Sequence, residues 1–282
     1  MDNKKAVNKE QQFNISRSVY GPIKSWRFGL SLGIDLLFVN SICSFNCVYC
    51  QLGNIQKHTA QRKEYVATAK VIEDFKEVSK NKPFDIITYS GNGEPTLATN
   101  FKEIIISLKA LTHVPQSILT NGTTLLNPDV IEALCLLDKV SVKLDAGSED
   151  FFRRINRPVT GCTLQSVMDG IDNLKKKFDG ELEVQSMFCN ATMADLDNYI
   201  SLLNKIKPDK VQLNMPTRPY PSEWHRENRG NHLQAYDHPV STLKKISRDN
   251  AEMVFKAVRE RTDIDVQSNS SFIEAIDTTG YQ

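Results

Sequence analysis

The stretch Cys43-Ser-Phe-Asn-Cys47-Val-Tyr-Cys50 places three cysteines within eight residues. Thiolates packed this closely can all face one point, and they are too close in sequence to pair as disulfides without strain. The spacing therefore indicates a metal centre with three protein ligands. No fourth protein ligand is evident, so one position of the metal would stay open, as a catalytic centre requires. Structural zinc is the main alternative, although zinc fingers usually add a second Cys/His pair.

A second motif, Gly91-Asn-Gly-Glu-Pro95, follows the next predicted strand at residues 84–89. Its glycines free the backbone to approach a ligand closely. The carboxylate of Glu94, next to the rigid Pro95, offers an acceptor for an ammonium group. A plain turn is the alternative interpretation. The position of this motif, one βα unit after the cysteines, favours a binding role.

Short apolar runs alternate with helical patterns around these two motifs. Strands are predicted at residues 34–39, 84–89, 116–120, 139–144, 181–188, 210–214 and, as a short one, 264–267. Helices are predicted at residues 68–80, 101–111, 128–136, 164–178, 195–206 and about 241–261. Glycines and a proline in residues 20–33 predict specific turns instead of a helix.

This alternation of strands and helices favours a parallel sheet with right-handed crossovers. Six units instead of eight predict an α/β fold, a partial (β/α)6 barrel of the TIM type, with a C-terminal helical extension. We expect one domain over residues 1–282, with a mobile tail at 1–18, the barrel core at 19–215 and the extension at 216–282. The cysteine loop follows the first strand, at the edge where such sheets place their chemistry.

Composition narrows the class of protein without naming a substrate. The chain has 282 residues, of which 40% are hydrophobic and 24% charged, which is typical of a soluble globular protein. A formal net charge of +1 gives no global reason to expect nucleic acid or an anionic membrane as partner. No signal-peptide pattern and no run of ~20 apolar residues are visible. We therefore expect a cytoplasmic protein with no membrane partner.

Together the two motifs make the chain resemble the radical SAM enzymes. That family shows C-x₃-C-x-aromatic-C after the first strand and a GGEP-like turn after the second. Cys43, Cys47, Tyr49 and Cys50 match the first part, and residues 91–95 match the second with Asn92 interposed. The resemblance covers roughly residues 30–215.

The resemblance implies that the three thiolates hold three irons of a [4Fe–4S] cluster and that the fourth iron binds S-adenosylmethionine. Reductive cleavage of this cofactor would give a 5′-deoxyadenosyl radical that abstracts hydrogen from an unassigned substrate. The protein would orient both cofactors and exclude water. Glu94 and its flanking backbone would bind the methionine ammonium, and Tyr49 would lie against the adenosine.

Polar residues at later strand ends complete the implied site. The cofactor-binding candidates are Tyr49, Gly91, Asn92, Gly93, Glu94, Pro95, Thr120, Asn121, Lys143, Asp145, Asn190 and Asn214. For those at strand ends, capping or turn formation is the alternative. The catalytic residue is unknown, with Lys143, Asp145, Cys189 and His225 as candidates. Of the remaining cysteines, Cys135 suits the core, Cys189 ends a strand and could face the cavity, and Cys162 has no predicted place.

A narrower resemblance points to a substrate class. Tyr20-Gly-Pro, Ser31-Leu-Gly-Ile-Asp35 and the segment 47–53 look like the radical SAM subgroup of the wyosine-base synthases, which act on a guanosine of tRNA. Those synthases carry a second cluster on upstream cysteines, and this chain has no cysteine before Cys43. The substrate-contact candidates are Arg27, Arg218, Trp224 and Arg226, which also suit an ordinary surface or an ordered loop.

The partners implied are a reducing electron donor such as flavodoxin or ferredoxin and a small-molecule, peptide or RNA substrate. We expect a monomer, and the reaction class (oxidoreductase, lyase or transferase) stays open. A non-catalytic metal or redox module is the remaining alternative. It would leave the second motif without a purpose.

Overall fold

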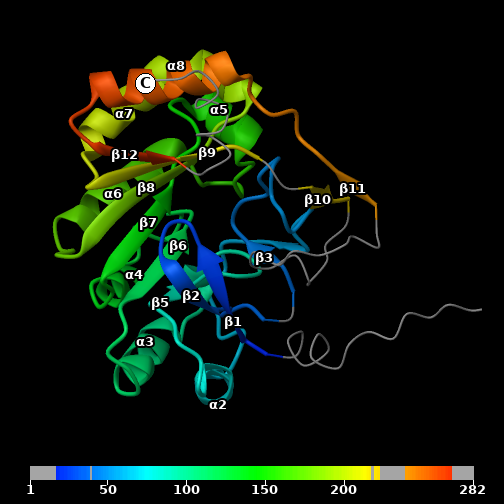
Figure 1. Cartoon of the computed structure of the whole chain (residues 1–282), viewed down its shortest axis with the longest axis vertical. Coiled ribbons are helices and arrows are strands. Elements are labelled where there is room, and N and C mark those ends of the chain that lie inside the picture. Colours follow the sequence, from blue (N-terminus) through cyan, green and yellow to red (C-terminus); the bar gives the residue numbers. More distant parts are fainter. Residues whose placement is uncertain (1–16, 39, 217–218, 223–238, 269–282) are drawn as a thin grey trace, which may run out of the picture.

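The computed structural model of the chain describes residues 17–38, 40–216, 219–222 and 239–268. Within these residues an eight-stranded sheet has the order β1-β2-β5-β6-β7-β8-β9-β12 (Figure 1). Its strands are β1 (Val19–Ser25), β2 (Gly29–Ile34), β5 (Ile86–Tyr89), β6 (Gln116–Thr120), β7 (Lys139–Lys143), β8 (Glu181–Met187), β9 (Lys210–Asn214) and β12 (Asp265–Ser268).

Within this sheet the seven strands other than β1 run parallel to one another, and only β1 is antiparallel to its neighbour β2. The helices are α2 (Thr68–Ser79), α3 (Phe101–Lys109), α4 (Pro128–Leu134), α5 (Glu149–Ile155), α6 (Leu164–Lys175), α7 (Leu196–Ile206) and α8 (Arg248–Arg261). This βα alternation confirms the predicted α/β fold with its partial barrel. Since β1 and β12 form the two ends of the strand order, the sheet is open.

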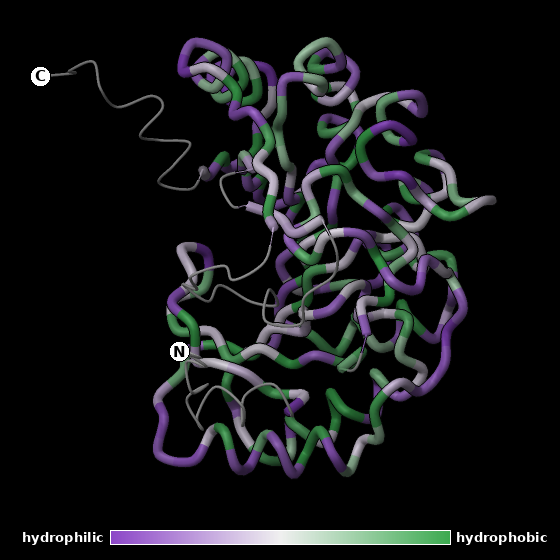
Figure 2. Tube along the Cα trace, turned by 90° about the vertical axis from the view of Figure 1, so that its right-hand side faces the viewer, coloured by the Kyte–Doolittle hydropathy of each residue, from purple (hydrophilic) through white to green (hydrophobic). Residues whose placement is uncertain are grey.

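Most helices lie on the outer side of the sheet because each is apolar along one face. The buried residues of α7, for example, recur at helical spacing: Leu196, Tyr199, Ile200, Leu203 and Ile206. In Figure 2 hydrophilic and hydrophobic residues alternate around the outer helical coils. None of the helices within the described residues is long and apolar enough to cross a membrane.

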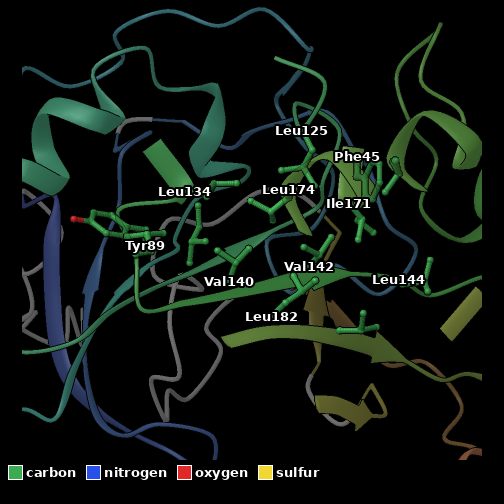
Figure 3. Packing of buried hydrophobic residues seen from close by; sticks show 14 of the residues in the cluster. Phe45, Tyr89, Leu125, Leu134, Val140, Val142, Leu144, Ile171, Leu174 and Leu182 are labelled. Carbon is green, nitrogen blue, oxygen red and sulfur yellow. The ribbon is translucent and has the colours of Figure 1, made fainter. Parts of the chain in front are cut away.

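The main core lies between the sheet and these helices. Figure 3 shows Val140 and Val142 of β7 beside Ile171 and Leu174 of α6, and all four side chains are at most 1% exposed. Two small sheets lie apart from this core, on the opposite side of the central sheet from most helices (Figure 1). They pair β3 (Ile42–Cys43) with β4 (Lys57–His58) and β10 (Tyr220–Pro221) with β11 (Val240–Ser241).

The first parallel strand lies earlier than the sequence predicts. The strand β2 ends at Ile34, so the prediction of a strand at residues 34–39 was wrong. A turn follows because Oδ1 of Asp35 accepts hydrogen bonds from the backbone N–H groups of Leu37 (3.0 Å) and Phe38 (3.1 Å). The predicted turn region before it forms the β1–β2 hairpin.

Two helices also differ from the predictions. The helix α5, between β7 and α6, was not predicted. The helix α8 begins at Arg248 instead of residue 241, because the hydroxyl of Ser247 accepts from the backbone N–H of Asn250 (3.3 Å) as an N-cap. The short strand β11 lies where the predicted helix would begin.

Candidate active site

The cysteine loop and the glycine motif are joined by direct hydrogen bonds between their backbones. Ile42, at the start of the loop, donates from its N–H to the carbonyl of Asn92 (2.8 Å), and its own carbonyl accepts from the N–H of Glu94 (3.0 Å). These bonds form an isolated parallel bridge between Ile42 and Gly93. Two motifs about fifty residues apart thus form one structural unit at the carboxyl edge of the sheet.

The other side of the cysteine loop rests on α5 and the residues after it. The ring of Phe45 packs edge-to-face on that of Phe152, with centroids 5.3 Å apart. Three backbone hydrogen bonds add to this contact: Asn46 N to Asn156 O (3.0 Å), Val48 N to Ile155 O (3.0 Å) and Val159 N to Ser44 O (2.9 Å). The unpredicted helix α5 therefore helps to fix the loop that carries the cysteines.

All three cysteines line one cavity of about 520 Å³ at the carboxyl ends of the parallel strands. Its size falls in the range of small-molecule and cofactor sites. Six other predicted site residues line the same cavity: Tyr49, Gly91, Gly93, Lys143, Asn214 and Arg27. These six come from the cysteine loop, the glycine motif, two later strands and the β1–β2 hairpin, so the fold gathers side chains from across the chain.

The donor set fits an iron–sulfur cluster. Burial, followed by the charge of Asp145, raises the pKa of the Cys47 thiol to about 12. Burial also raises the pKa of the thiols of Cys43 and Cys50. In this pocket the thiolate forms, which are the forms that bind metals, would need a cationic partner. Within the described ranges no three His, Cys, Asp or Glu side chains converge on a single ion, and in a four-iron cluster each thiolate binds a different iron.

A buried carboxylate, Asp145, connects the cysteine loop to the sheet. Its Oδ2 accepts from the Tyr49 hydroxyl and from Nδ2 of Asn156 (2.6 Å), and its Oδ1 accepts from the N–H of Met187 (2.7 Å). Nζ of Lys143 lies 3.0 Å from the same Oδ1 and 5.0 Å from the centroid of the Tyr49 ring. Asp145 itself does not line the cavity, whereas Lys143 does. The carboxylate of Asp145 thus anchors the cysteine loop to the sheet.

The carboxylate of Glu94 is also engaged inside the protein, which differs from its predicted role as an ammonium acceptor. It is 2% exposed and does not line the cavity. Its Oε1 accepts from the N–H (3.1 Å) and hydroxyl (2.6 Å) of Thr96 and from the hydroxyl of Thr120 (2.7 Å). Its Oε2 accepts from the N–H of Asn121 (2.6 Å). Burial raises its pKa, while these bonds act in the opposite direction. Glu94 therefore caps the 3₁₀ helix η1 (Pro95–Leu97) and ties it to β6.

Several predicted residues lie away from the cavity. Asn92 is buried and donates from Nδ2 to Oδ2 of Asp35 (2.7 Å). Pro95, Thr120 and Asn121 are buried, and Asn190 is exposed in the 3₁₀ helix η2 (Asn190–Asp195). Cys189, which from its sequence position could face the cavity, is buried as the residue before η2 and does not line the cavity. His225, Arg218, Trp224 and Arg226 lie outside the described residues.

The tip of the β1–β2 hairpin forms part of the cavity wall. Cζ of Arg27 lies 5.5 Å from the ring centroids of both Trp26 and Phe28, and all three residues line the cavity. Trp26 is 40% exposed. Arg27 was a substrate-contact candidate from its position in the sequence, whereas its two aromatic neighbours were not. The hairpin therefore presents a cation between aromatic rings to the same space as the cysteines.

The sequence was also compared with known families and proteins. The sequence model of the Radical SAM superfamily matches residues 37–203. The UPF0026 protein slr1464 of Synechocystis is 44% identical over 246 residues, which are 86% of this chain and 92% of that protein.

Solved structures share the fold at low sequence identity. Streptococcus suis SuiB bound to S-adenosylmethionine superposes with a TM-score of 0.59 at 10% identity, over 86% of this chain and 52% of SuiB. The chain thus spans about half the length of SuiB. An archaeal TYW1 superposes with a TM-score of 0.50 at 15% identity, over 82% of this chain and 72% of that protein.

Proposed function

Because the chain belongs to the radical SAM superfamily, we propose that Cys43, Cys47 and Cys50 bind its [4Fe–4S] cluster and that the adjoining cavity receives S-adenosylmethionine and substrate. Enzymes of this superfamily use both cofactors, together with a reductant. When bound, the two cofactors would supply reductive cleavage of S-adenosylmethionine to a 5′-deoxyadenosyl radical for hydrogen abstraction from the substrate. The substrate itself stays unassigned.

One observation carries this proposal. The three cysteines and the glycines Gly91 and Gly93 line the same cavity, and backbone hydrogen bonds join the two motifs. A cluster on the cysteines would therefore lie beside a glycine backbone that a polar ligand can approach closely. The purpose of the second motif, which a non-catalytic redox module would not explain, follows from this arrangement.

The side chains around the cysteines have distinct tasks in this proposal. The backbone of Gly91 and Gly93 offers polar groups to the amino-acid part of the cofactor. Lys143, held by Asp145, presents an ammonium group for its carboxylate. The ring of Tyr49 is fixed by its hydrogen bond to Asp145 and forms a flat wall for the adenosine. Asn214 adds an amide from the end of β9.

The test uses protein reconstituted with iron and sulfide under anaerobic conditions. Addition of S-adenosylmethionine and a strong reductant should give 5′-deoxyadenosine, detected by chromatography and mass spectrometry. Cys47→Ala should abolish both the cluster and this product. Cys162→Ala is the matched control, because Cys162 is buried in the core and does not line the cavity. An intact cluster that yields no 5′-deoxyadenosine would refute the proposal.

A nucleotide of tRNA is the second candidate for the substrate, in keeping with the wyosine-synthase-like sequence features. The hairpin favours it, because a guanidinium between aromatic rings can stack on a base or hold a phosphate. Arg27 is the described residue that we propose to contact this substrate, with Arg218, Trp224 and Arg226 as further candidates. The electron donor would be a small protein such as flavodoxin or ferredoxin.

The proposal of a tRNA substrate is tested by measuring the binding of bulk tRNA to the protein at several salt concentrations. Phosphate contacts release counterions, so the affinity for bulk tRNA should fall as salt rises. Arg27→Gln should weaken binding, whereas Lys24→Gln should not. Lys24 lies exposed on the same hairpin and does not line the cavity. Absence of tRNA binding at low salt would favour a small-molecule or peptide substrate.

A further inference from the structure

We propose that Asn156 and Asn121 are positioning residues that donate amide hydrogen bonds to the sulfurs of Cys47 and Cys43 and thereby raise the reduction potential of the cluster. This inference rests on the proposed function, because it takes these cysteines as the cluster ligands. Neither asparagine needs to touch substrate for this role. Asn156 stands out only once its contacts in the structure are known.

Asn156 lies directly behind one of the thiolates. Its Nδ2 is 3.5 Å from Sγ of Cys47 and 2.6 Å from Oδ2 of Asp145. The residue is 1% exposed, and its backbone carbonyl accepts from the N–H of Asn46 (3.0 Å) in the cysteine loop. The hydrogen bond to Asp145 sets which end of the side-chain amide faces the thiolate, so its Nδ2 hydrogens point at two anionic acceptors, while Oδ1 has no hydrogen-bond partner among the described residues.

Asn121 occupies the corresponding position behind the first cysteine. Its Nδ2 is 3.5 Å from Sγ of Cys43 and 2.8 Å from Oγ of Ser44. The opposite end of the amide is fixed as well, because Oδ1 accepts from the N–H (3.1 Å) and hydroxyl (2.8 Å) of Thr123. This bonding sets which end of the amide faces the sulfur, so Asn121 acts as a donor.

Donors to cluster sulfurs change the energy of the two redox states by different amounts. Reduction adds one negative charge, part of which lies on the ligand sulfurs. An N–H dipole aimed at a sulfur stabilises the more negative state more strongly, and its effect is larger in a buried site. Hydrogen bonds to the sulfurs are among the features that set iron–sulfur potentials. Both asparagines should therefore make the cluster easier to reduce.

Asn156 also separates the thiolate from a buried negative charge. The charge of Asp145 acts against further negative charge on Cys47. Asp145 is offset by Lys143 at 3.0 Å and by the N–H of Met187 at 2.7 Å. The amide of Asn156 bridges Sγ of Cys47 and Oδ2 of Asp145, so replacing it with an apolar group removes a hydrogen-bond donor from both atoms. The effect of this residue should exceed that of Asn121.

The test compares three leucine variants of the anaerobically reconstituted protein: Asn156→Leu, Asn121→Leu and Asn100→Leu. Asn100 is the matched control, because it is also buried and donates from Nδ2, but to the carbonyl of Val66 (2.9 Å) instead of a cysteine. The readout is the midpoint potential of the cluster in a redox titration followed by electron paramagnetic resonance, with no substrate present. We expect more negative potentials for Asn156→Leu and Asn121→Leu and the wild-type value for Asn100→Leu.

The iron content of each sample separates this inference from the proposed function. A wild-type protein that assembles no cluster would refute the proposed function itself. A wild-type potential in Asn156→Leu with its four irons retained would overturn the inference. If the leucine variant does not fold, the smaller Asn156→Ala replaces it. An Asn156→Ala protein that folds but loses the cluster would also overturn the inference, since the residue would then serve assembly instead of tuning.

Discussion

The backbone of Gly93 lies so close to that of Ile42 that a Cβ atom at position 93 would be 1.8 Å from the carbonyl oxygen of Ile42. Gly93 also has a φ of +143°, which residues with a side chain rarely adopt. The contact is part of the bridge that joins the glycine motif to the cysteine loop. The glycine therefore permits the two motifs to approach each other, in addition to exposing backbone to the cavity.

Replacing Gly93 by alanine should push the two motifs apart. We expect Gly93→Ala to lose its iron and to be destabilised by more than about 2 kcal/mol, since the clash adds to the backbone strain. Gly161→Ala is the control, because Gly161 has a φ of +87° but a Cβ atom added there would meet no other atom within 4 Å. Iron analysis and urea unfolding give the comparison. Equal behaviour of the two variants would show that the contact with Ile42 is unimportant.

Removing the ring of Phe152 should loosen the cysteine loop from the side of α5. Phe152 is 3% exposed, and we expect Phe152→Ala to cost about 3–5 kcal/mol of stability. Phe75→Ala, in the pair Phe75–Phe84 with centroids 6.2 Å apart, should cost a similar amount far from the cysteines. Only Phe152→Ala should release iron faster to a chelator at a temperature where both variants are folded. Equal iron release would contradict the proposed anchoring role of α5.

Breaking the pair of Lys143 and Asp145 should leave a buried charge without its cation. The side chain of Asp145 is fully buried and that of Lys143 is 15% exposed. We expect Lys143→Met to lower the free energy of unfolding by about 3 kcal/mol. Combining it with Asp145→Asn should recover part of this loss, because the uncompensated charge is then absent. A double-mutant cycle measured by chemical unfolding gives the coupling, and strictly additive effects would refute it.

The raised pKa of Cys47 predicts how the reactivity of its thiol depends on pH before a cluster is assembled. The thiolate is the reactive form, and the folded protein holds the pKa at about 12 against an ordinary value of 9.0. Alkylation of Cys47 by iodoacetamide should therefore rise ~10-fold per pH unit from pH ~7 to ~10 without a plateau. In urea the same residue should level off near its ordinary pKa. Mass spectrometry of the modified peptide measures both profiles, and a plateau below pH ~10 in the folded protein would contradict the prediction.

The fold could be predicted from the sequence where local patterns are strong. The strand β6 has the bounds that the sequence predicts, Gln116–Thr120. The helix α4 begins at Pro128, a position where proline is tolerated in a first turn. The prediction of the first parallel strand was wrong because Leu37 and Phe38 are apolar but belong to a turn made by Asp35. A side-chain hydrogen bond to a nearby backbone overrides an apolar pattern, and the pattern gives no sign of it.

The candidate site could be predicted only in part for a similar reason. Residue type and spacing indicated the three cysteines and the glycine motif. They did not indicate that the carboxylate of Glu94 turns inward to Thr96, Thr120 and Asn121. Asn156 and Phe152 carry no local signal, because their role depends on contacts with residues about a hundred positions earlier in the chain.

The sequence by itself determined the α/β alternation, the three-cysteine motif and the family, because each follows from periodicity or from residue types at fixed local spacing. Only the tertiary structure decided what surrounds the cysteines: the contact of Gly93 with Ile42, the support from α5, and the amides of Asn121 and Asn156 at the sulfurs. These depend on which strand ends meet at one edge of the sheet. Long-range packing fixes that arrangement, and the sequence alone does not distinguish these two asparagines from the others in the chain.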